Sequence, residues 1–577
     1  MIGFWIMTKK IVIWGAGKIG RGFIADLFNH EGFDICLVDE SADLIRQLNE
    51  QKSYTVVHAS SKNIEQVKIS GYRAITTQDQ EELQREFDST SLIALAVFPK
   101  NFETVAAQVR KLVIKRKANG FDTAINLILC TNLIHAGPKF REFLYQDLAP
   151  DQVDFFNDRV GIVEALVIRI APVPPQEALE KDPLVVWTNG YAELPVDKQG
   201  FKGPLPACQS LRLVEDMRAE EIRKIYTYNM CHAVLSYQGK FFDYPLLVDC
   251  LEDKVIRVEA ESALGEVSAA LQKEFGFTEA DMHRWISNVL EHTNNPTVGD
   301  TVARSAADPK RKLARDDRLI GPTLLCLKNG IDPKHLIRGI AAAFHYYDVD
   351  DPSSIEIQQT IKEIGIAAAV ERYCGLGAGN ESLLQRIVET FRRLPLENAW
   401  RKKSWQAYQL GMEYEEKYHG CGQSVVAAVT ETLGVFNEEV FKTATGLSGG
   451  IGQVNDSTCS AFIGGVLSIG LIFSRERKNF DGDRESKYKN FELVQKYRSR
   501  FIEEFGSNYC ANIHTAKYGR PYDLTNKAEQ KEFDAAGAHV RGGGCTDVTG
   551  KASMLAIEVL SESLIERELS RETSDAK

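Results

Sequence analysis

The stretch RKIYTYNMCHA, residues 223–233, places an amine, an amide and an imidazole in one short segment: Lys224, Asn229 and His232. If this segment is helical, a rotation of about 100° per residue places His232 roughly 80° and Asn229 roughly 140° around the axis from Lys224. All three side chains then lie on one side, where an amine can exchange a proton and an amide can donate hydrogen bonds to a ligand. The same residues also suit a partly exposed helix with a snorkelling lysine and a hydrogen-bonded core histidine.

A glycine turn near the N-terminus predicts a nucleotide site that such a helix could serve. In KKIVIWGAGKIGRGFIADLF a β-branched run, residues 11–14, leads into Gly15, Gly17 and Gly20 and then into a helical pattern. Gly15 permits the tight turn, Gly17 lets the backbone approach a pyrophosphate, and Gly20 lets the helix pack closely on the strand. The order of strand, glycine turn and helix is the context in which this motif binds dinucleotides.

The second predicted strand, FDICLVDE, ends in Asp39. An acid at this position hydrogen-bonds the ribose 2′-hydroxyl of the cofactor and repels a 2′-phosphate, so NAD is favoured over NADP. The alternative is a chance glycine turn with Asp39 as a surface acid.

Two further predicted strands, SLIALAVF (91–98) and TAINLILCTN (123–132), are each followed by helical periodicity and extend the unit into an open parallel sheet. Ligands of such sheets bind beyond the carboxyl ends of the strands. Asn132, at the end of the later strand, is therefore placed to face the nicotinamide, although an asparagine there could also support a turn.

Length and pattern predict three domains. The chain has 577 residues, and single cores stop growing near 250 to 300 residues. We expect an α/β Rossmann-type dinucleotide-binding domain over 1–204, a mostly α-helical substrate domain over 205–393 and a mostly α-helical extra domain over 394–577.

Composition indicates the class of partner. Hydrophobic residues make up 44% and charged residues 26% of the chain, as in soluble globular proteins. The net charge of −11 argues against nucleic acid or an acidic membrane and favours a small soluble substrate. No stretch is apolar enough to span a bilayer, and eleven scattered cysteines indicate the reducing cytoplasm. A monomer and a dimer both remain open.

Several ordered segments from about residue 10 to 393 resemble the polyol-specific long-chain dehydrogenase family, and within it the mannitol-1-phosphate 5-dehydrogenases. The segments are GAGKIGRGFI, CTNLIHAG, VDKQGFKG, the K-x4-N-x2-H arrangement from Lys224 to His232, NNPTVGDTVAR, RKLARDDRLIGP and GIAAAFHYYDVDDP. The resemblance implies NAD-dependent interconversion of D-mannitol 1-phosphate and D-fructose 6-phosphate without a metal ion.

The resemblance also implies roles for individual residues. Lys224 is the general acid/base, Asn132 and Asn229 donate hydrogen bonds to the developing alkoxide, and His232 orients the substrate. Because a lysine must lose its proton to act in the oxidation direction, we expect the site to lower the pKa of Lys224. Candidate substrate residues in the matching segments, each of which could instead serve the structure, are Arg304, Lys312, Arg318 and His345.

Two positions depart from the family pattern. Thr131 replaces an acid, and Phe98 replaces a glycine beside the expected cofactor. Both put the fit of the cofactor and the rate in doubt more than the type of reaction. The nearest alternative is a mannitol 2-dehydrogenase or a hexuronate reductase that acts on an unphosphorylated substrate.

The last 180 or so residues resemble the C-GCAxxG-C-C family, described as redox-active, over roughly 405–560. Its GCAxxG motif corresponds here to the segment from Cys459 to Gly464. Four cysteines could form a redox relay, ligate a soft metal or an iron–sulfur cluster, or be small buried thiols in an interaction module. They are Cys421, Cys459, Cys510 and Cys545.

Overall fold

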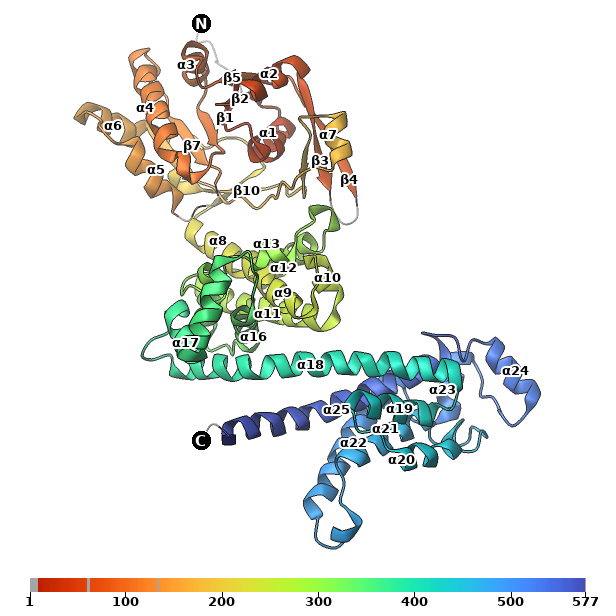
Figure 1. Ribbon diagram of the computed structural model, residues 1–577. Coiled ribbons are helices and arrows are strands. Elements are labelled where there is room, and N and C mark those ends of the chain that lie inside the picture. Colours follow the sequence, from red (N-terminus) through yellow and green to blue (C-terminus); the bar gives the residue numbers. More distant parts are fainter. Residues whose placement is uncertain (1–8, 60–62, 132, 134, 576–577) are drawn as a thin grey trace. The chain divides into compact units, whose positions relative to one another are not determined.

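A computed structural model of the chain describes residues 9–59, 63–131, 133 and 135–575. Its N-terminal part is built on a six-stranded sheet in the order β5-β2-β1-β6-β7-β8, in which every neighbouring pair is parallel (Figure 1). This is the strand order of a doubly wound nucleotide-binding sheet, in which the first strand of the chain lies at the centre. The strands are β1 (Lys10–Trp14), β2 (Asp34–Asp39), β5 (Arg73–Thr76), β6 (Leu92–Leu95), β7 (Ile125–Leu129) and β8 (Val160–Glu164).

Alternate residues of the central strand pack into two separate cores. Ile11 and Ile13 contact the side of α1 and α2, whereas Val12 and Trp14 contact the side of α3, α4, α5 and α6. Because both faces of the sheet are covered, its strands are apolar throughout, as the sequence pattern predicts. The helices are α1 (Ala25–His30), α2 (Ala42–Gln51), α3 (Gln80–Ser89), α4 (Phe102–Ala118), α5 (Ala136–Leu144) and α6 (Pro150–Arg159).

Two small sheets that the sequence pattern did not predict complete this part of the chain. One has the order β4-β3-β9 and the other pairs β10 with β11. Their strands are β3 (Ser53–Ala59), β4 (Ile64–Ser70), β9 (Val186–Thr188), β10 (Leu194–Asp197) and β11 (Leu211–Val214), and α7 (Gln176–Lys181) precedes β9.

The following part is helical, as predicted. The long helix α11 and the neighbouring α16 pack on α9, which continues the segment quoted first. The helices are α8 (Met217–Lys224), α9 (Met230–Gly239), α10 (Leu247–Glu252), α11 (Lys254–Phe275), α12 (Glu279–Thr293), α13 (Val302–Ala306), α14 (Pro309–Lys312), α15 (Ile320–Lys328), α16 (Lys334–His345) and α17 (Pro352–Cys374).

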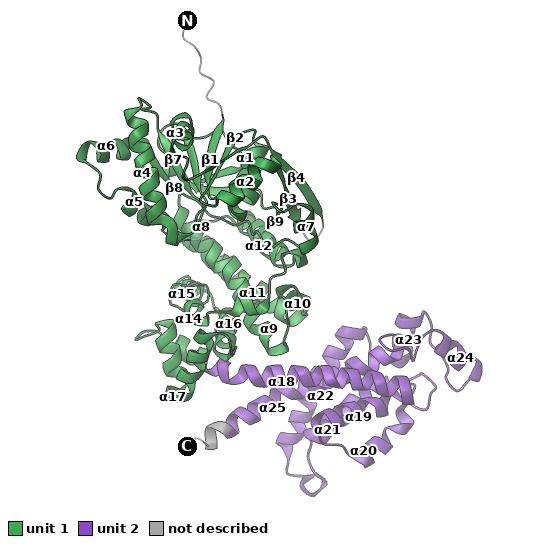
Figure 2. Cartoon of the chain, turned by 45° about the horizontal axis from the view of Figure 1, so that its top comes forward, with its two compact units in different colours: residues 1–387 green, residues 388–577 purple. Residues whose placement is uncertain are grey.

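The chain divides into two compact units, residues 1–387 and 388–577, coloured separately in Figure 2. The boundary falls inside the helix α18 (Glu381–Tyr418). The second unit is a helical bundle whose core lies between α19, α21, α22 and α25. Besides part of α18, the helices of this unit are α19 (Cys421–Leu433), α20 (Glu438–Thr443), α21 (Ser460–Ile472), α22 (Arg484–Phe505), α23 (Cys510–Tyr518), α24 (Lys527–Ala535) and α25 (Gly544–Asp575). Within the described part of the chain, no helix has the length and apolar character needed to cross a bilayer.

Candidate functional site

The glycine turn between β1 and the first helix has the geometry of a dinucleotide-binding turn. Gly15 has φ +100°, and a Cβ there would lie 2.4 Å from the carbonyl oxygen of Ala96. A Cβ on Gly20 would lie 1.9 Å from the carbonyl oxygen of Gly15, so this glycine lets the helix pack closely on the turn. A Cβ on Gly17 would meet no atom within 4 Å, which leaves open space where a pyrophosphate would approach.

Asp39 closes the same turn from the end of β2. Its Oδ2 accepts a hydrogen bond from the backbone N–H of Ala16 at 2.8 Å, and its Oδ1 accepts one from Ser41 at 2.9 Å. Each oxygen keeps a second lone pair, so the carboxylate can still accept hydrogen bonds from ribose hydroxyl groups. These residues fit a dinucleotide. Phe98, which replaces a glycine of the family pattern, is 73% exposed, so its ring is not packed into the glycine turn.

The helix that carries Lys224, Asn229 and His232 is not a regular α-helix. A π-helical segment, η4 (Ile225–Asn229), separates α8 from α9, and the N–H of Met230 bonds to the carbonyl of Ile225 five residues earlier. In a π-turn, residues five apart lie about one turn above one another, so Asn229 follows Lys224 along the axis. Lys224, Asn229 and His232 lie on one side of the helix, as predicted, because all three line one cavity. Their angular spacing around the axis differs from that of an ideal α-helix.

The Lys224 amine is held inside this cavity. Its Nζ donates a hydrogen bond to the carbonyl oxygen of Val167 at 2.8 Å. Burial and the positive charge of Arg318 lower the pKa of Lys224 from 10.5 to about 8, although Glu221 opposes the shift. The direction is the one expected for a lysine that must both give and accept a proton near neutral pH.

His232 and Asn229 face the same space. The Nε2 of His232 lies 3.2 Å from Thr293 Oγ1, and its Nδ1 lies 3.8 Å from Asp300. Burial, opposed by Asp300, lowers the pKa of His232 to about 4, so its imidazole is neutral. The Asn229 amide makes no side-chain hydrogen bond with the described residues and is available to a ligand. Asn132 lies outside the described residues.

The cavity has a volume of about 740 Å³ and extends from the glycine turn to the helix that carries Lys224, Asn229 and His232. Lys18, from the glycine turn, lines it together with the residues of the helical part, and the segment from Val167 to Val173 forms a further wall. Asp300 is the one carboxylate that we find among its described lining residues. The cationic lining residues are Lys18, Arg169, Lys224, Arg304, Arg311, Lys312 and Arg318.

The three cationic residues predicted to bind the substrate differ in how far their charged groups already contact other residues. Arg304 is exposed and forms a two-point ion pair with Asp300 at 2.5 and 2.8 Å. Lys312 is buried, and its Nζ donates to the carbonyl oxygens of Ser305, at 2.6 Å, and of Ala307. Burial and the neighbouring positive charges of Arg318, Arg311 and Arg304 lower the pKa of Lys312 to about 7.

The terminal nitrogens of Arg318 are less engaged than the end groups of Arg304 and Lys312. Its Nε contacts Asp317 at 2.7 Å, while Nη1 and Nη2 make no hydrogen bond with any residue that the structure describes. The fourth candidate, His345, is not among the described residues that line the cavity, and its ring packs on Phe241 at 5.6 Å between centroids.

Sequence reasoning missed several residues of the site. Asp300 lies within NNPTVGDTVAR but was not singled out, and it faces His232. Lys18 was part of the glycine motif without a role of its own, and Arg311 opens RKLARDDRLIGP. Tyr228 and His292 carried no signal, since an aromatic residue and a lone histidine on helices are usually core residues.

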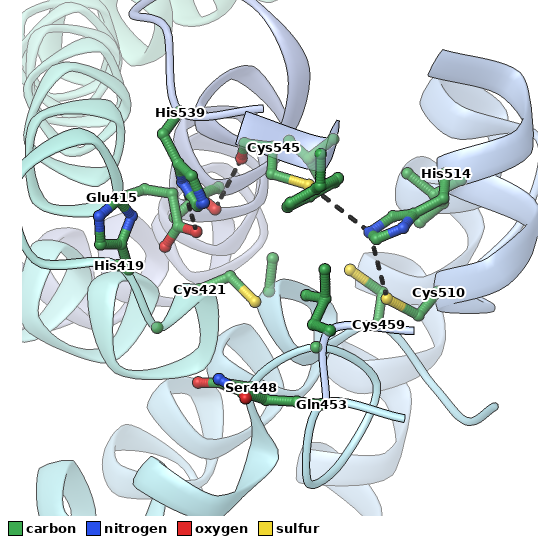
Figure 3. A pocket seen from close by; sticks show the side chains of 18 of the residues that line it. Glu415, His419, Cys421, Ser448, Gln453, Cys459, Cys510, His514, His539 and Cys545 are labelled. Atoms are coloured by element: carbon green, nitrogen blue, oxygen red, sulfur yellow. Dashed lines mark hydrogen bonds and ion pairs between the residues drawn. The ribbon is translucent and has the colours of Figure 1, made fainter. Parts of the chain in front are cut away.

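A second cavity, of about 310 Å³, lies in the second unit, and the four predicted cysteines converge on it (Figure 3). Each cysteine stands at the start of a different helix. Cys421 and Cys510 are the first residues of α19 and α23, Cys459 precedes α21, and Cys545 is the second residue of α25. The four separated cysteines are therefore brought together by four helix N-termini.

Cys459 and Cys510 are buried, whereas Cys421 and Cys545 are partly buried. Burial raises the pKa of Cys459 to about 11 and that of Cys545 to about 12, and it also raises the pKa values of Cys421 and Cys510. All four are free thiols. Because the thiolate is the form that attacks electrophiles and binds metals, the raised pKa values make these thiols slow to react unless a bound cation removes their protons.

Histidines and a buried acid share the cavity with the thiols. His514 Nε2 lies 3.8 Å from the sulfur of Cys510 and 3.9 Å from that of Cys545. On the other wall, Glu415 Oε1 lies 3.8 Å from His539 Nδ1, and burial raises the pKa of Glu415 to about 7. No three His, Cys, Asp or Glu side chains of the described chain are arranged to hold a metal ion.

Close packing of two helices requires a glycine at position 464, the last residue of the GCAxxG segment. A Cβ there would lie 2.6 Å from the carbonyl oxygen of Gly422 and 2.9 Å from Val425. The glycine therefore lets α21 pack closely on α19, which keeps the helix starts at Cys421 and Cys459 next to each other.

The sheet order and the glycine turn define a protein with a Rossmann-type nucleotide-binding domain, and Lys224 lines a cavity that the same unit forms. Residues 9–210 match the mannitol dehydrogenase Rossmann domain, and residues 216–387 match the mannitol dehydrogenase C-terminal domain. The chain belongs to the mannitol dehydrogenase family. Residues 419–559 match a further family, described as "Putative redox-active protein (C_GCAxxG_C_C)".

Solved structures support the fold. A D-sorbitol dehydrogenase in substrate-free form has a TM-score of 0.60 at 15% identity, and the match covers 67% of this chain and 93% of that one. The mannitol 2-dehydrogenase of Pseudomonas fluorescens, in a ternary complex with NAD and D-mannitol, has a TM-score of 0.51 at 16% identity, covering 66% and 90%. The family matches confirm the two predicted families, and the structure confirms an α/β domain followed by mostly helical parts.

Proposed function

We propose that this chain is an NAD-dependent dehydrogenase that interconverts D-mannitol 1-phosphate and D-fructose 6-phosphate. The observation that carries the proposal is the composition of the 740 Å³ cavity, which places Lys224 and its neighbours beside a cluster of cations. The positive charge of Arg318 acts on both Lys224 and Lys312, so these like charges lie close together and favour an anionic ligand. A phosphate group accepts hydrogen bonds from several cations at once. NAD is the cofactor that the glycine turn and Asp39 fit.

Bound NADH supplies the hydride that reduces the ketose carbonyl. As negative charge develops on the carbonyl oxygen, Asn229 donates a hydrogen bond to it, together with Asn132, and Lys224 transfers its proton to that oxygen. In the oxidation direction the neutral Lys224 amine accepts the proton of the hydroxyl group. His232, with Asp300 near its Nδ1, holds the substrate in place.

Arg318 and Lys312 bind the phosphate group in this proposal. Arg318 is largely buried and offers two terminal nitrogens, which suits a two-point contact with a phosphate. A bound phosphate would stabilise the charged form of Lys312 and offset the repulsion from its neighbours.

A second candidate substrate is an unphosphorylated polyol or hexuronate. Two observations favour it: Arg304 is already paired with Asp300, and the solved relatives named above are a sorbitol dehydrogenase and a mannitol 2-dehydrogenase. Those relatives are too distant in sequence to decide the substrate.

The two candidates are separated by the rate of NADH oxidation with fructose 6-phosphate, fructose and fructuronate at equal concentrations. We expect turnover with fructose 6-phosphate and little with the other two, because fructose and fructuronate lack the phosphate group that Arg318 and Lys312 would bind. Faster turnover of fructose or fructuronate would rule out the phosphorylated substrate.

For the second unit we propose a redox or soft-metal site built from Cys421, Cys459, Cys510 and Cys545, working in the reducing cytoplasm. Sulfur ligands favour soft metals and iron–sulfur clusters, and binding would deprotonate the thiols. The alternative is an interaction module that uses the cysteines only for packing. Because the donor atoms are not yet at ligating positions, metal binding would require the side chains to rotate inward.

Replacing all four cysteines by serine in the full-length chain tests this proposal. We expect the purified variant to lose bound metal, or to lose the change in NADH oxidation rate that mild oxidants cause in the wild type. Cys326→Ser, at a buried thiol of the first unit, is the matched control and should change neither. If the wild type and the four-serine variant have the same metal content and respond equally to oxidants, the redox or soft-metal site is excluded and the interaction module is the remaining explanation.

A further inference from the structure

Two polar side chains of the catalytic cavity have no partner in the described structure. Tyr228 is 5% exposed and its hydroxyl group makes no hydrogen bond, and His292 is 7% exposed and its Nε2 makes none. Both residues line the cavity that holds Lys224. A buried polar group without a partner costs about 1 to 3 kcal/mol, so such groups in an active-site cavity point to a ligand that satisfies them.

Asn189 fixes which ring nitrogen of His292 carries the proton. The Oδ1 of Asn189 accepts a hydrogen bond from the backbone N–H of Ile170 at 3.0 Å, so its Nδ2 faces His292 Nδ1 at 2.7 Å. Since Nδ2 can only donate, His292 Nδ1 must be the acceptor, and the proton of the neutral ring lies on Nε2. Burial keeps the ring neutral by lowering the pKa of His292 to about 3. His292 therefore offers a fixed donor to the cavity.

His232 has the opposite polarity. The hydroxyl group of Thr293 donates to the carbonyl of Val289 at 2.8 Å, so its oxygen accepts from His232 Nε2 at 3.2 Å. The Nδ1 of neutral His232 is then an acceptor. The centroids of the two rings lie 6.3 Å apart. The centroid of the Tyr228 ring lies 5.4 Å from that of His292, with the two ring planes nearly perpendicular.

We propose that Tyr228 and His292 bind hydroxyl groups of an open-chain polyol or ketose and so determine the specificity of the site. A sugar hydroxyl both donates and accepts, so it can accept from His292 Nε2–H and donate to His232 Nδ1 or to the Tyr228 oxygen. This inference rests on the proposed dehydrogenase function and adds to the phosphate contacts a set of contacts to the carbon chain.

Tyr228→Phe is the sharpest test, because it removes only the unpaired oxygen. We expect kcat/KM for the active ketose to fall about 10- to 100-fold, since the substrate hydroxyl loses its partner in a closed site. The midpoint of thermal unfolding should stay the same or rise, because no hydrogen bond within the protein is lost. Tyr226→Phe, on the same π-turn but not among the residues lining the cavity, is the control and should leave kcat/KM within twofold.

Asn189→Asp tests the assignment of the His292 proton. An aspartate accepts but does not donate, so His292 Nδ1 would take the proton and Nε2 would turn from a donor into an acceptor. We expect a loss of kcat/KM of similar size to that of Tyr228→Phe. Ketoses that each lack one hydroxyl group complete the test. For one of them, kcat/KM of the wild type should be lower than with the complete ketose, whereas kcat/KM of Tyr228→Phe should be the same with both substrates.

The outcomes separate this inference from the proposed function. Wild-type turnover of one of the tested ketoses establishes the reaction independently of Tyr228 and His292. If the wild type turns over that ketose and both variants match it within twofold, the inference is overturned while the proposed reaction stands. Weaker binding of NADH with an unchanged KM for the ketose would instead assign the two groups to the cofactor and also overturn it.

Discussion

Replacing Lys224 by alanine should lower kcat/KM for fructose 6-phosphate reduction about 10²- to 10⁴-fold, the usual contribution of a positioned general acid. The amine is held in the cavity by its hydrogen bond to Val167, and burial together with Arg318 brings its pKa to about 8. Water could replace the proton donor only slowly in a site arranged around this side chain. Initial rates of NADH oxidation under saturating NADH measure the effect.

The comparison needs proof that the Lys224→Ala protein still folds and binds its cofactor. Binding of NADH, followed by its fluorescence, should remain within a few-fold of the wild type, because Lys224 does not belong to the glycine turn. Lys240→Met is a suitable control, since Lys240 lies on the continuation of the same helix and pairs with Asp348 instead of lining the cavity. A loss of less than threefold in Lys224→Ala would assign the proton transfer to another group.

Arg318→Gln should reduce kcat/KM for fructose 6-phosphate about 10- to 100-fold, mainly through KM. A hydrogen bond to a charged group contributes about 1.5 to 3 kcal/mol, and about 1.4 kcal/mol corresponds to a factor of ten. The free Nη1 and Nη2 atoms of Arg318 are the groups that we assign to the phosphate. Binding and initial rates over a range of ketose concentrations separate KM from kcat.

The same substitution should change the poorer activity with fructose by less than about threefold, since fructose carries no phosphate to lose. Arg315→Gln is the matched control: Arg315 donates to the carbonyl of Gly375 at 2.6 Å and is not among the residues lining the cavity. An equal loss with both sugars in Arg318→Gln would show that Arg318 acts on Lys224 or on the fold and does not bind phosphate.

Local sequence patterns predicted most of the fold of the first unit. The apolar run before Gly15 and the acid at the end of β2 have fixed spacings along the chain, because one strand, one turn and one helix are contiguous. The hairpin of β3 and β4 was not predicted, since β4 is mostly exposed and its polar sequence, IEQVKIS, does not alternate clearly. The π-turn at Ile225–Asn229 was also not predicted, because its residues have ordinary helical propensities.

Some features of the two sites could not be predicted because they depend on contacts between residues that are far apart in the sequence. The convergence of Cys421, Cys459, Cys510 and Cys545 is decided by helix packing, to which Gly464 contributes, and their spacing along the chain carries no such information. His292 becomes a fixed donor only because Asn189, far away in the sequence, is itself held by a backbone N–H.

The pH dependence of kcat/KM for fructose 6-phosphate reduction tests the role of Lys224 most directly. Because the protonated amine is required for reduction, activity should be constant below pH 7 and should fall tenfold per pH unit above a pKa of about 8, the value for Lys224. Oxidation of mannitol 1-phosphate should show the opposite trend and rise through the same pH. The residual activity of Lys224→Ala should lack this transition. A wild-type profile that stays flat from pH 7 to pH 10, or the same transition in Lys224→Ala, would contradict the assignment of Lys224 as the general acid/base.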